Sequence, residues 1–155
     1  MAGNQAENNQ PAIIMQTQYI KDLSLEIPHA PEIFKNLGEQ PEIKIDVNIN
    51  AAQLEQNYYN VTLDFHIDGD VKGEKFFILE MQYGGVVQLN VPEEHIQPVL
   101  MIEIPHMLFP YARQAISNVM TNGGLPPLML SPIDFVAMYK ARAAQQEDAN
   151  KPAND

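Results

Sequence analysis

Three stretches of this chain alternate apolar and polar residues at every second position, and this pattern constrains the fold most strongly. The first is 22–27, the second is 42–49 and the third is 59–68. Successive side chains of a β-strand point to opposite faces, so each stretch predicts a strand with one core face and one solvent face. Strands of this kind are typical of antiparallel sheets.

The segment 76–83 differs because it is apolar on both faces. Its alternation places Phe76 and Ile78 on the same face as Glu80. Such a strand is expected at the centre of a covered sheet or at a subunit interface. Asp68-Gly69-Asp70 and the nearby Gly73 predict a turn, so the third and fourth strands should form a hairpin.

The C-terminal third is predicted to be helical. Ile104–Asn122 carries helix-forming residues, and Gly123-Gly124 predicts where that helix ends. Ser131 is a favourable N-cap for a second helix, with Pro132 in its first turn and Asp134 at the capping-box position. Strands followed by helices predict an α+β fold rather than a parallel α/β sheet.

The length of 155 residues is typical of a single domain. The polar ends predict a disordered N-terminal tail at 1–12 and a flexible C-terminal tail at 141–155, on either side of one domain at 13–140. The N-terminal residues lack the basic and apolar regions of a signal peptide, and no apolar run approaches the ~18 residues of a membrane span. We therefore expect a cytoplasmic protein.

The net charge of −11 is concentrated in one part of the chain. Fifteen carboxylates and five lysines lie between Lys21 and Glu103. This acidic balance disfavours nucleic acids and anionic membranes as partners, because both would be repelled. Placed on the solvent faces of strands, the same charge would suit a basic protein partner.

The sequence offers little for catalysis. The chain has no cysteine, its serines lie in no Gly-x-Ser-x-Gly motif, and its histidines form no metal-binding spacing. The carboxylates at 64–74 do not have the spacing of an EF-hand. We expect neither an enzyme nor a metal site or cofactor, and an acidic enzyme would need converging polar groups that the sequence does not indicate.

Binding is better supported. Met101, Met107, Met120, Met129 and Met138 suit either core gaps or an adaptable apolar surface. The loop 123–132 is rich in Gly and Pro yet carries four large apolar residues. A loop of this composition packs as a lid or lines a groove.

Four blocks of this sequence resemble the SecB protein-export chaperones. They are 21–26 (KDLSLE), 80–85 (EMQYGG), 108–113 (LFPYAR) and 130–135 (LSPIDF). The resemblance covers about 16–139. It implies a four-stranded antiparallel sheet with C-terminal helices, assembled as a homotetramer that is a dimer of dimers. It also implies a holdase that keeps unfolded precursors competent for translocation and delivers them to the SecA motor ATPase.

The resemblance also implies where partners bind. The motor would dock on the outward face of the sheet, at Asp22, Glu26, Ile78 and Glu80. Clients would bind between the loop at 27–40 and the loop at 121–131. The groove residues expected there are Phe34, Leu37, Leu125, Leu128 and Met129. An alternative is a SecB-like chaperone that serves another partner, such as a toxin–antitoxin system. The family also implies the cytoplasm of a Gram-negative-type bacterium.

Overall fold

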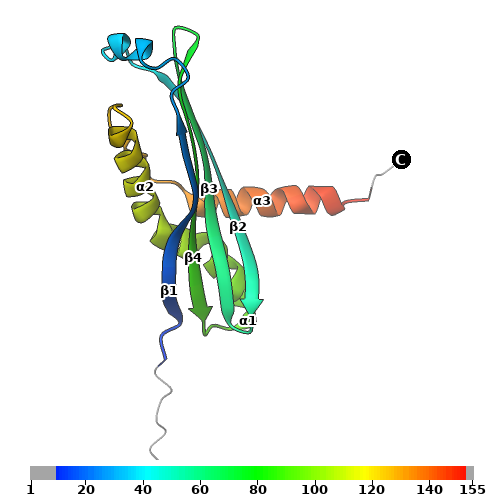
Figure 1. Cartoon of the computed structure of the whole chain (residues 1–155). Helices are drawn as coiled ribbons and strands as arrows, with labels where there is room; N and C mark the ends of the chain where they lie inside the picture. Colours follow the sequence, from blue (N-terminus) through cyan, green and yellow to red (C-terminus); the bar gives the residue numbers. More distant parts are fainter. Residues whose placement is uncertain (1–9, 153–155) are drawn as a thin grey trace, which may run out of the picture.

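Four long antiparallel strands form one sheet with the order β1-β4-β3-β2 (Figure 1). The computed structural model describes residues 10–152, so most of the expected N-terminal tail lies outside the described residues. The strands are β1 (Ile13–Glu26), β2 (Glu42–Glu55), β3 (Tyr58–Val71) and β4 (Glu74–Leu89). The predicted antiparallel sheet and α+β class are confirmed.

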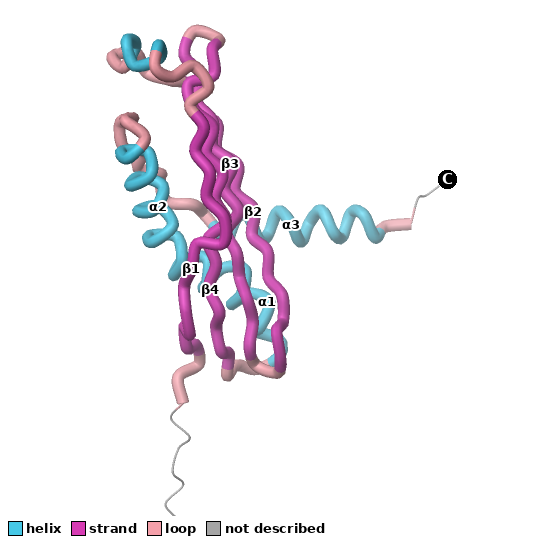
Figure 2. The backbone as a smooth tube through the Cα atoms, in the orientation of Figure 1, coloured by secondary structure: helices cyan, strands magenta, loops and turns pink. Residues whose placement is uncertain are grey.

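The connections place β1 and β2 at opposite edges of the sheet. The predicted β3–β4 hairpin is confirmed, and its turn is Lys72-Gly73, where both residues have the positive φ of a tight hairpin turn. The chain between β1 and β2 crosses one end of the sheet and contains a short 3-10 helix, η1 (Glu32–Asn36) (Figure 2). A salt bridge of 2.7 Å joins Lys72 Nζ in the hairpin turn to Glu39 in this crossover segment, and its hydrogen bond raises the pKa of Lys72.

One face of the sheet is covered by a continuous helical segment. It consists of α1 (Glu93–Pro98), a π-helical turn η2 (Val99–Glu103) and α2 (Ile104–Asn122). The predicted bounds of α2 are confirmed, but the helical segment begins earlier, at Glu93. A Cβ atom at Gly85 of β4 would lie 2.8 Å from Leu108, so glycine lets α2 approach the sheet closely.

The last helix, α3 (Phe135–Asn150), differs from the prediction at both ends. Its N-cap is Asp134, whose Oδ1 accepts a 2.9 Å hydrogen bond from Ala137 N. Ser131 does not cap it, because the helix begins only after Asp134 and residues 131–134 lie outside it. At the other end, the range 141–150 is helical rather than an irregular tail, as its alanines and glutamines favour. The helix projects beyond the β2 edge (Figure 1).

The orientation predicted for Phe76 is wrong, because a β-bulge interrupts the alternation of β4. Asp70 pairs with Lys75 and Gly69 pairs with Phe77, so Phe76 is the extra residue between the two pairs. The bulge shifts the alternation by one residue, and Phe76 is buried next to Phe77 instead of facing outward with Ile78.

The apolar face of β2 is a second departure from the predicted core. On β3 the inward side chains Leu63, Phe65 and Ile67 are buried, as the alternation predicts. On β2 Ile43 and Ile45 are exposed, and burial is reached only at Ile49. The described residues of the chain therefore leave an apolar strip open along this edge.

Candidate docking face and client groove

The strand register places four of the expected site residues next to one another. Glu26 pairs with Ile78, and the neighbouring pair joins Ser24 to Glu80. Asp22, two residues before Ser24, is on the same face of β1 and pairs with Gln82. This face is opposite the helices, because the alternate residues of β4 are the buried ones. Asp22, Glu26 and Glu80 are exposed there, and Ile78 is half-buried.

The acidic surface continues across β3 and β2. Ile78 pairs with Asp68, and Glu80 pairs with His66, which in turn pairs with Asp46 of β2. We call this surface the acidic face. It comprises Asp22, Glu26, Asp46, Asp64, His66, Asp68, Ile78 and Glu80. The β3 residues were missed as site residues, although the predicted β3–β4 hairpin already implied that they are neighbours of Glu80.

One histidine and one lysine lie among the carboxylates of the acidic face. His66 lies between two carboxylates, with Nδ1 3.1 Å from Glu80 Oε1 and Nε2 3.5 Å from Asp68 Oδ2. Lys75 Nζ lies 3.1 Å from Asp70 and 3.3 Å from Asp68. The hydrogen bond to Asp70 is the main cause that raises the pKa of Lys75. The contact between His66 and Glu80 is exposed, and exposed pairs add little stability, so it leaves Glu80 available to a partner.

A shallow hollow of about 290 Å³ lies in the middle of the acidic face. Asp22, Asp46, Asp64 and Glu80 contribute to its lining. Asp64 Oδ2 accepts a 2.6 Å hydrogen bond from Asn50, which holds this carboxylate in place. A concave acidic surface of this kind matches a protruding basic side chain on a partner.

The two loops expected to form the client groove meet at the end of the sheet. Gly124, with φ of 78°, leaves so little space that a Cβ atom there would lie 3.2 Å from the Phe34 ring. Phe34 therefore joins the crossover segment to the loop after α2.

Beside this contact is a hollow of about 440 Å³, which we call the crossover hollow. Leu37 and Leu128 line it, together with Ile43, Phe76 and Met120, which were not expected. The bulge at Phe76 brings that ring into the hollow, and a bulge is difficult to infer from alternation alone.

The other expected groove residues lie elsewhere. Leu125 is 4% exposed and belongs to the core. Phe34 is partly buried against the core, and Met129 is 61% exposed outside the hollow.

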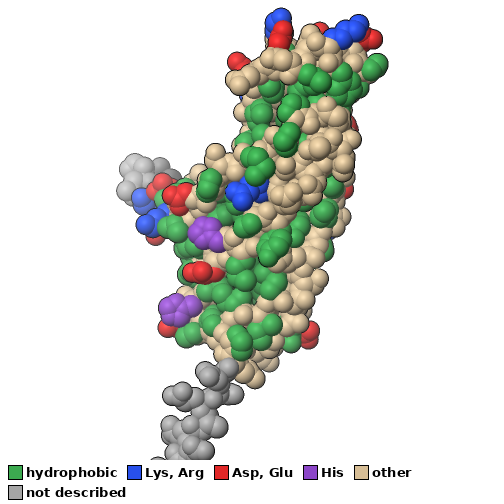
Figure 3. Space-filling model, turned by 90° about the vertical axis from the view of Figure 1, so that its left-hand side faces the viewer, with side chains coloured by type: hydrophobic (Ala, Val, Ile, Leu, Met, Phe, Trp, Pro, Cys, Tyr) green, Lys and Arg blue, Asp and Glu red, His purple; other side chains and the backbone are tan. Residues whose placement is uncertain are grey.

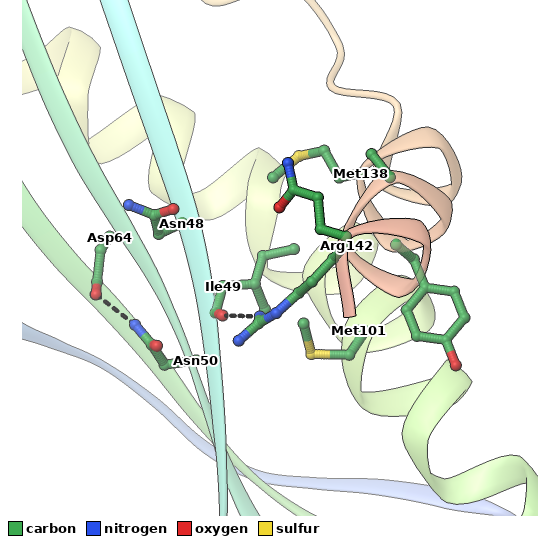
Figure 4. A pocket seen from close by; sticks show the side chains of 10 residues that line it. Asn48, Ile49, Asn50, Asp64, Met101, Met138 and Arg142 are labelled. Atoms are coloured by element: carbon green, nitrogen blue, oxygen red, sulfur yellow. Dashed lines mark hydrogen bonds between the residues drawn. The ribbon is translucent and has the colours of Figure 1, made fainter. Parts of the chain in front are cut away.

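The crossover hollow continues along the inward side chains of β2, which we call the β2 track: Ile43, Ile45, Val47 and Ile49. A middle hollow of about 450 Å³ is lined by Ile45, Val47 and Leu130. Beyond it, a hollow of about 500 Å³ includes Ile49 and Arg142 (Figure 4). Met138 of α3 lines both of these hollows.

The described part of the chain has no arrangement that indicates a metal centre or a membrane span. Within residues 10–152, no three His, Asp or Glu side chains are placed to hold a metal ion. No helix in the same range is long and apolar enough to cross a membrane. Ser24 lies on the acidic face and Ser117 is buried in α2, so these two hydroxyls do not converge.

Comparison with known proteins agrees with this arrangement. The family model described as preprotein translocase subunit SecB matches residues 6–146. The protein-export protein SecB of Rhodospirillum rubrum is 45% identical over 147 residues, which cover 94% of this chain and 92% of the relative. That of Paramagnetospirillum magneticum is 49% identical over 136 residues, covering 87% and 88%.

A solved structure has the same fold. It is a SecB-like chaperone of Mycobacterium tuberculosis in complex with a peptide from the HigA1 antitoxin, with a TM-score of 0.67. The match covers 79% of this chain and 91% of that chain at 12% identity, which supports the fold alone. Sequence, architecture and relatives agree, and the chain belongs to the SecB family of protein-export chaperones.

Proposed function

We propose that the protein is a holdase without catalytic activity, which binds unfolded secretory precursors and delivers them to the SecA motor. The observation that carries the proposal is the β1–β4 register, which brings Asp22, Glu26, Ile78 and Glu80 together. Complementary charge steers association and fixes orientation, so a basic surface on the motor is the expected partner of the acidic face.

Client binding follows from a balance of two free energies. Ordering one client residue costs about 1–2 kcal/mol, and burying one large apolar side chain returns roughly 1.5–3 kcal/mol. Only unfolded segments rich in apolar residues therefore bind with a net gain. Folded proteins have already buried those side chains, so selectivity requires no sequence motif.

The proposed assembly is a homotetramer, a dimer of dimers. β1 is an edge strand with unpaired backbone groups on one side, and Ile20 on it is exposed. On the α2 side of the molecule, Met107 and Tyr111 are exposed, and Figure 3 shows many hydrophobic side chains on that side. Two apolar surfaces on different elements suit two interfaces, and several grooves in one particle would add avidity. We place the protein in the cytoplasm of a Gram-negative-type bacterium, consistent with its proteobacterial relatives.

The docking proposal is tested with Glu80→Lys and Asp22→Ala, measured by calorimetric titration with purified SecA. We expect Glu80→Lys to weaken binding about tenfold, because it replaces an attraction with a repulsion, and Asp22→Ala to weaken it less. Glu93→Lys in α1 is the matched control, since it makes the same charge change at an exposed site away from the acidic face. Equal affinity of all variants for SecA would remove the docking assignment.

The holdase proposal is tested without nucleotide, by light scattering from a denatured exported precursor diluted into the chaperone. We expect the wild type to suppress aggregation, and Leu128→Ser to suppress it less at equal concentration, because Leu128 lines the crossover hollow. Val136→Ser is the control, because Val136 is an exposed apolar residue that lines none of the hollows described above. Aggregation unaffected by the wild-type chaperone would overturn the holdase assignment.

The alternative partner is an antitoxin, which a SecB-like chaperone of the same fold binds as a peptide. The relatives at 45% and 49% identity are export proteins, and the acidic face is better explained by a docking motor than by a client. The SecA titration separates the two. A chaperone dedicated to an antitoxin would have no need to bind SecA, so Glu80→Lys would not weaken a specific affinity for SecA.

A further inference from the structure

The β2 track ends at a single cation. From Ile43 to Ile49 the track is about 20 Å long at ~3.3 Å per residue. At its far end, Arg142 of α3 reaches the free edge of β2, and its Nη1 donates a 3.0 Å hydrogen bond to the backbone oxygen of Ile49. Figure 4 shows this contact between strand and helix. Met101, Met138 and Tyr139 supply apolar walls around it.

The Arg142 guanidinium makes only one of the hydrogen bonds that it could make to other described residues. A guanidinium has five N–H donors and pairs best with a carboxylate through two of them. Here one donor is engaged by a neutral carbonyl, and within residues 10–152 no carboxylate lies within 4.0 Å of Arg142. Asp64 lines the same hollow; its Oδ2 accepts a hydrogen bond from Asn50, and its Oδ1 is buried without a hydrogen-bond partner, but it is not within 4.0 Å of Arg142. Arg142 lines this hollow and therefore keeps N–H donors that a group entering it can use.

We propose that Arg142 is a specificity-determining residue that binds an acidic side chain at one end of a client segment lying along the β2 track. This inference rests on the proposed holdase function. The occupant is an unfolded client segment, because the track is continuous with the crossover hollow through Ile43 and with the middle hollow through Met138.

Arg142 would create a local preference for an acidic client side chain at one end of the β2 track. A chain with a net charge of −11 repels acidic segments over most of its surface. Arg142 makes one end of the track an exception, so a bound client is oriented with its carboxylate toward α3. Because the Arg142 side chain is exposed, the gain is that of a partly screened ion pair, about fourfold in affinity for one carboxylate.

The test uses a set of fluorescent apolar peptides that differ only in which position carries Asp, Asn or Lys. With the wild type, one Asp position is expected to bind about fourfold tighter than Asn and about tenfold tighter than Lys. Arg142→Glu should reverse the order at that position, and Arg142→Lys should retain part of the preference for Asp. Rescue of the Lys peptide by Arg142→Glu is a result that loss of helix position alone would not produce.

Lys140→Glu is the matched control, since it makes the same charge change on α3 at an exposed side chain that lines none of the hollows. Circular dichroism of each variant checks that the helix content is retained. If the wild type binds every peptide equally and Arg142→Glu changes nothing, this inference is overturned while the holdase proposal stands. If the wild type binds none of the peptides, the holdase proposal itself fails.

Discussion

Strands β2 and β3 have nearly the same alternating pattern but opposite environments. Ile45 and Ile67 are paired directly across the two strands, yet Ile67 is 0% exposed and Ile45 is 45% exposed. The helical segment covers β4 and β3 and leaves most of β2 free, and α3 forms a hydrogen bond to this strand at Ile49 and borders the hollow beside Ile45 and Val47. Alternation thus identifies residues that share a face, whereas strand order and helix reach decide whether that face is core or binding surface.

The largest expected effect is on the covered side of this comparison. Ile67→Ala should lower the free energy of unfolding by about 3 kcal/mol, because it leaves a cavity in a fully packed region. Urea unfolding followed by circular dichroism measures the change. A loss below about 1 kcal/mol would mean that β3 is no better packed than β2, which would contradict the difference in environment between the two strands.

The matched change on the open side should act on binding instead. Ile45→Ala should alter the free energy of unfolding by only a few tenths of a kcal/mol and weaken the affinity for an apolar client about fivefold. Urea unfolding and fluorescence titration on the same preparation test both parts. A large loss of stability, or a fall in particle mass, would instead indicate that a second copy of the chain covers Ile45.

A smaller effect concerns Tyr83, on the inward face of β4. Burial is the main cause that raises the pKa of Tyr83, and Tyr111 adds to it; the phenol donates a 3.0 Å hydrogen bond to Gln18. Since the folded pKa lies above the unfolded value of about 10, the stabilisation is complete below pH ~10 and is lost as the pH rises further.

The measurement is the change in unfolding free energy between about pH 8 and pH 10.5. Over this pH range the unfolding free energy of the wild type should fall further than that of Tyr83→Phe. The additional loss should be below about 1 kcal/mol. Identical pH dependence of the two proteins would indicate that Tyr83 titrates alike in the folded and unfolded states, and that this part of β4 is as open as β2.

Local patterns predicted much of the fold. The four strands, the β3–β4 hairpin and the bounds of α2 follow from alternation, turn residues and the Gly123-Gly124 stop. Each depends on neighbours along the chain, where backbone sterics and side-chain direction act directly. The outward placement of Asp22 and Glu80 was predictable for the same reason.

Features that depend on distant contacts were not predictable in this way. The bulge that buries Phe76 requires knowledge of the β3 register, and the exposure of Ile45 requires the reach of helices far along the chain. The contact between Arg142 and Ile49 joins residues whose proximity nothing in the sequence indicates. The candidate groove was therefore located by its loops, while the β2 track beside it was missed.

The strand order also has a consequence for synthesis of the chain. β2, β3 and β4 follow one another and can pair in turn, but β1 pairs only with β4 and has no partner until the residues up to Leu89 have been made. Of these four strands, the first to leave the ribosome is thus the last to join the sheet. Until β4 is made, Leu23 and Leu25 of each new copy lack the strand with which they pair, so during its own synthesis the chain exposes the kind of apolar segment that it would bind in its clients.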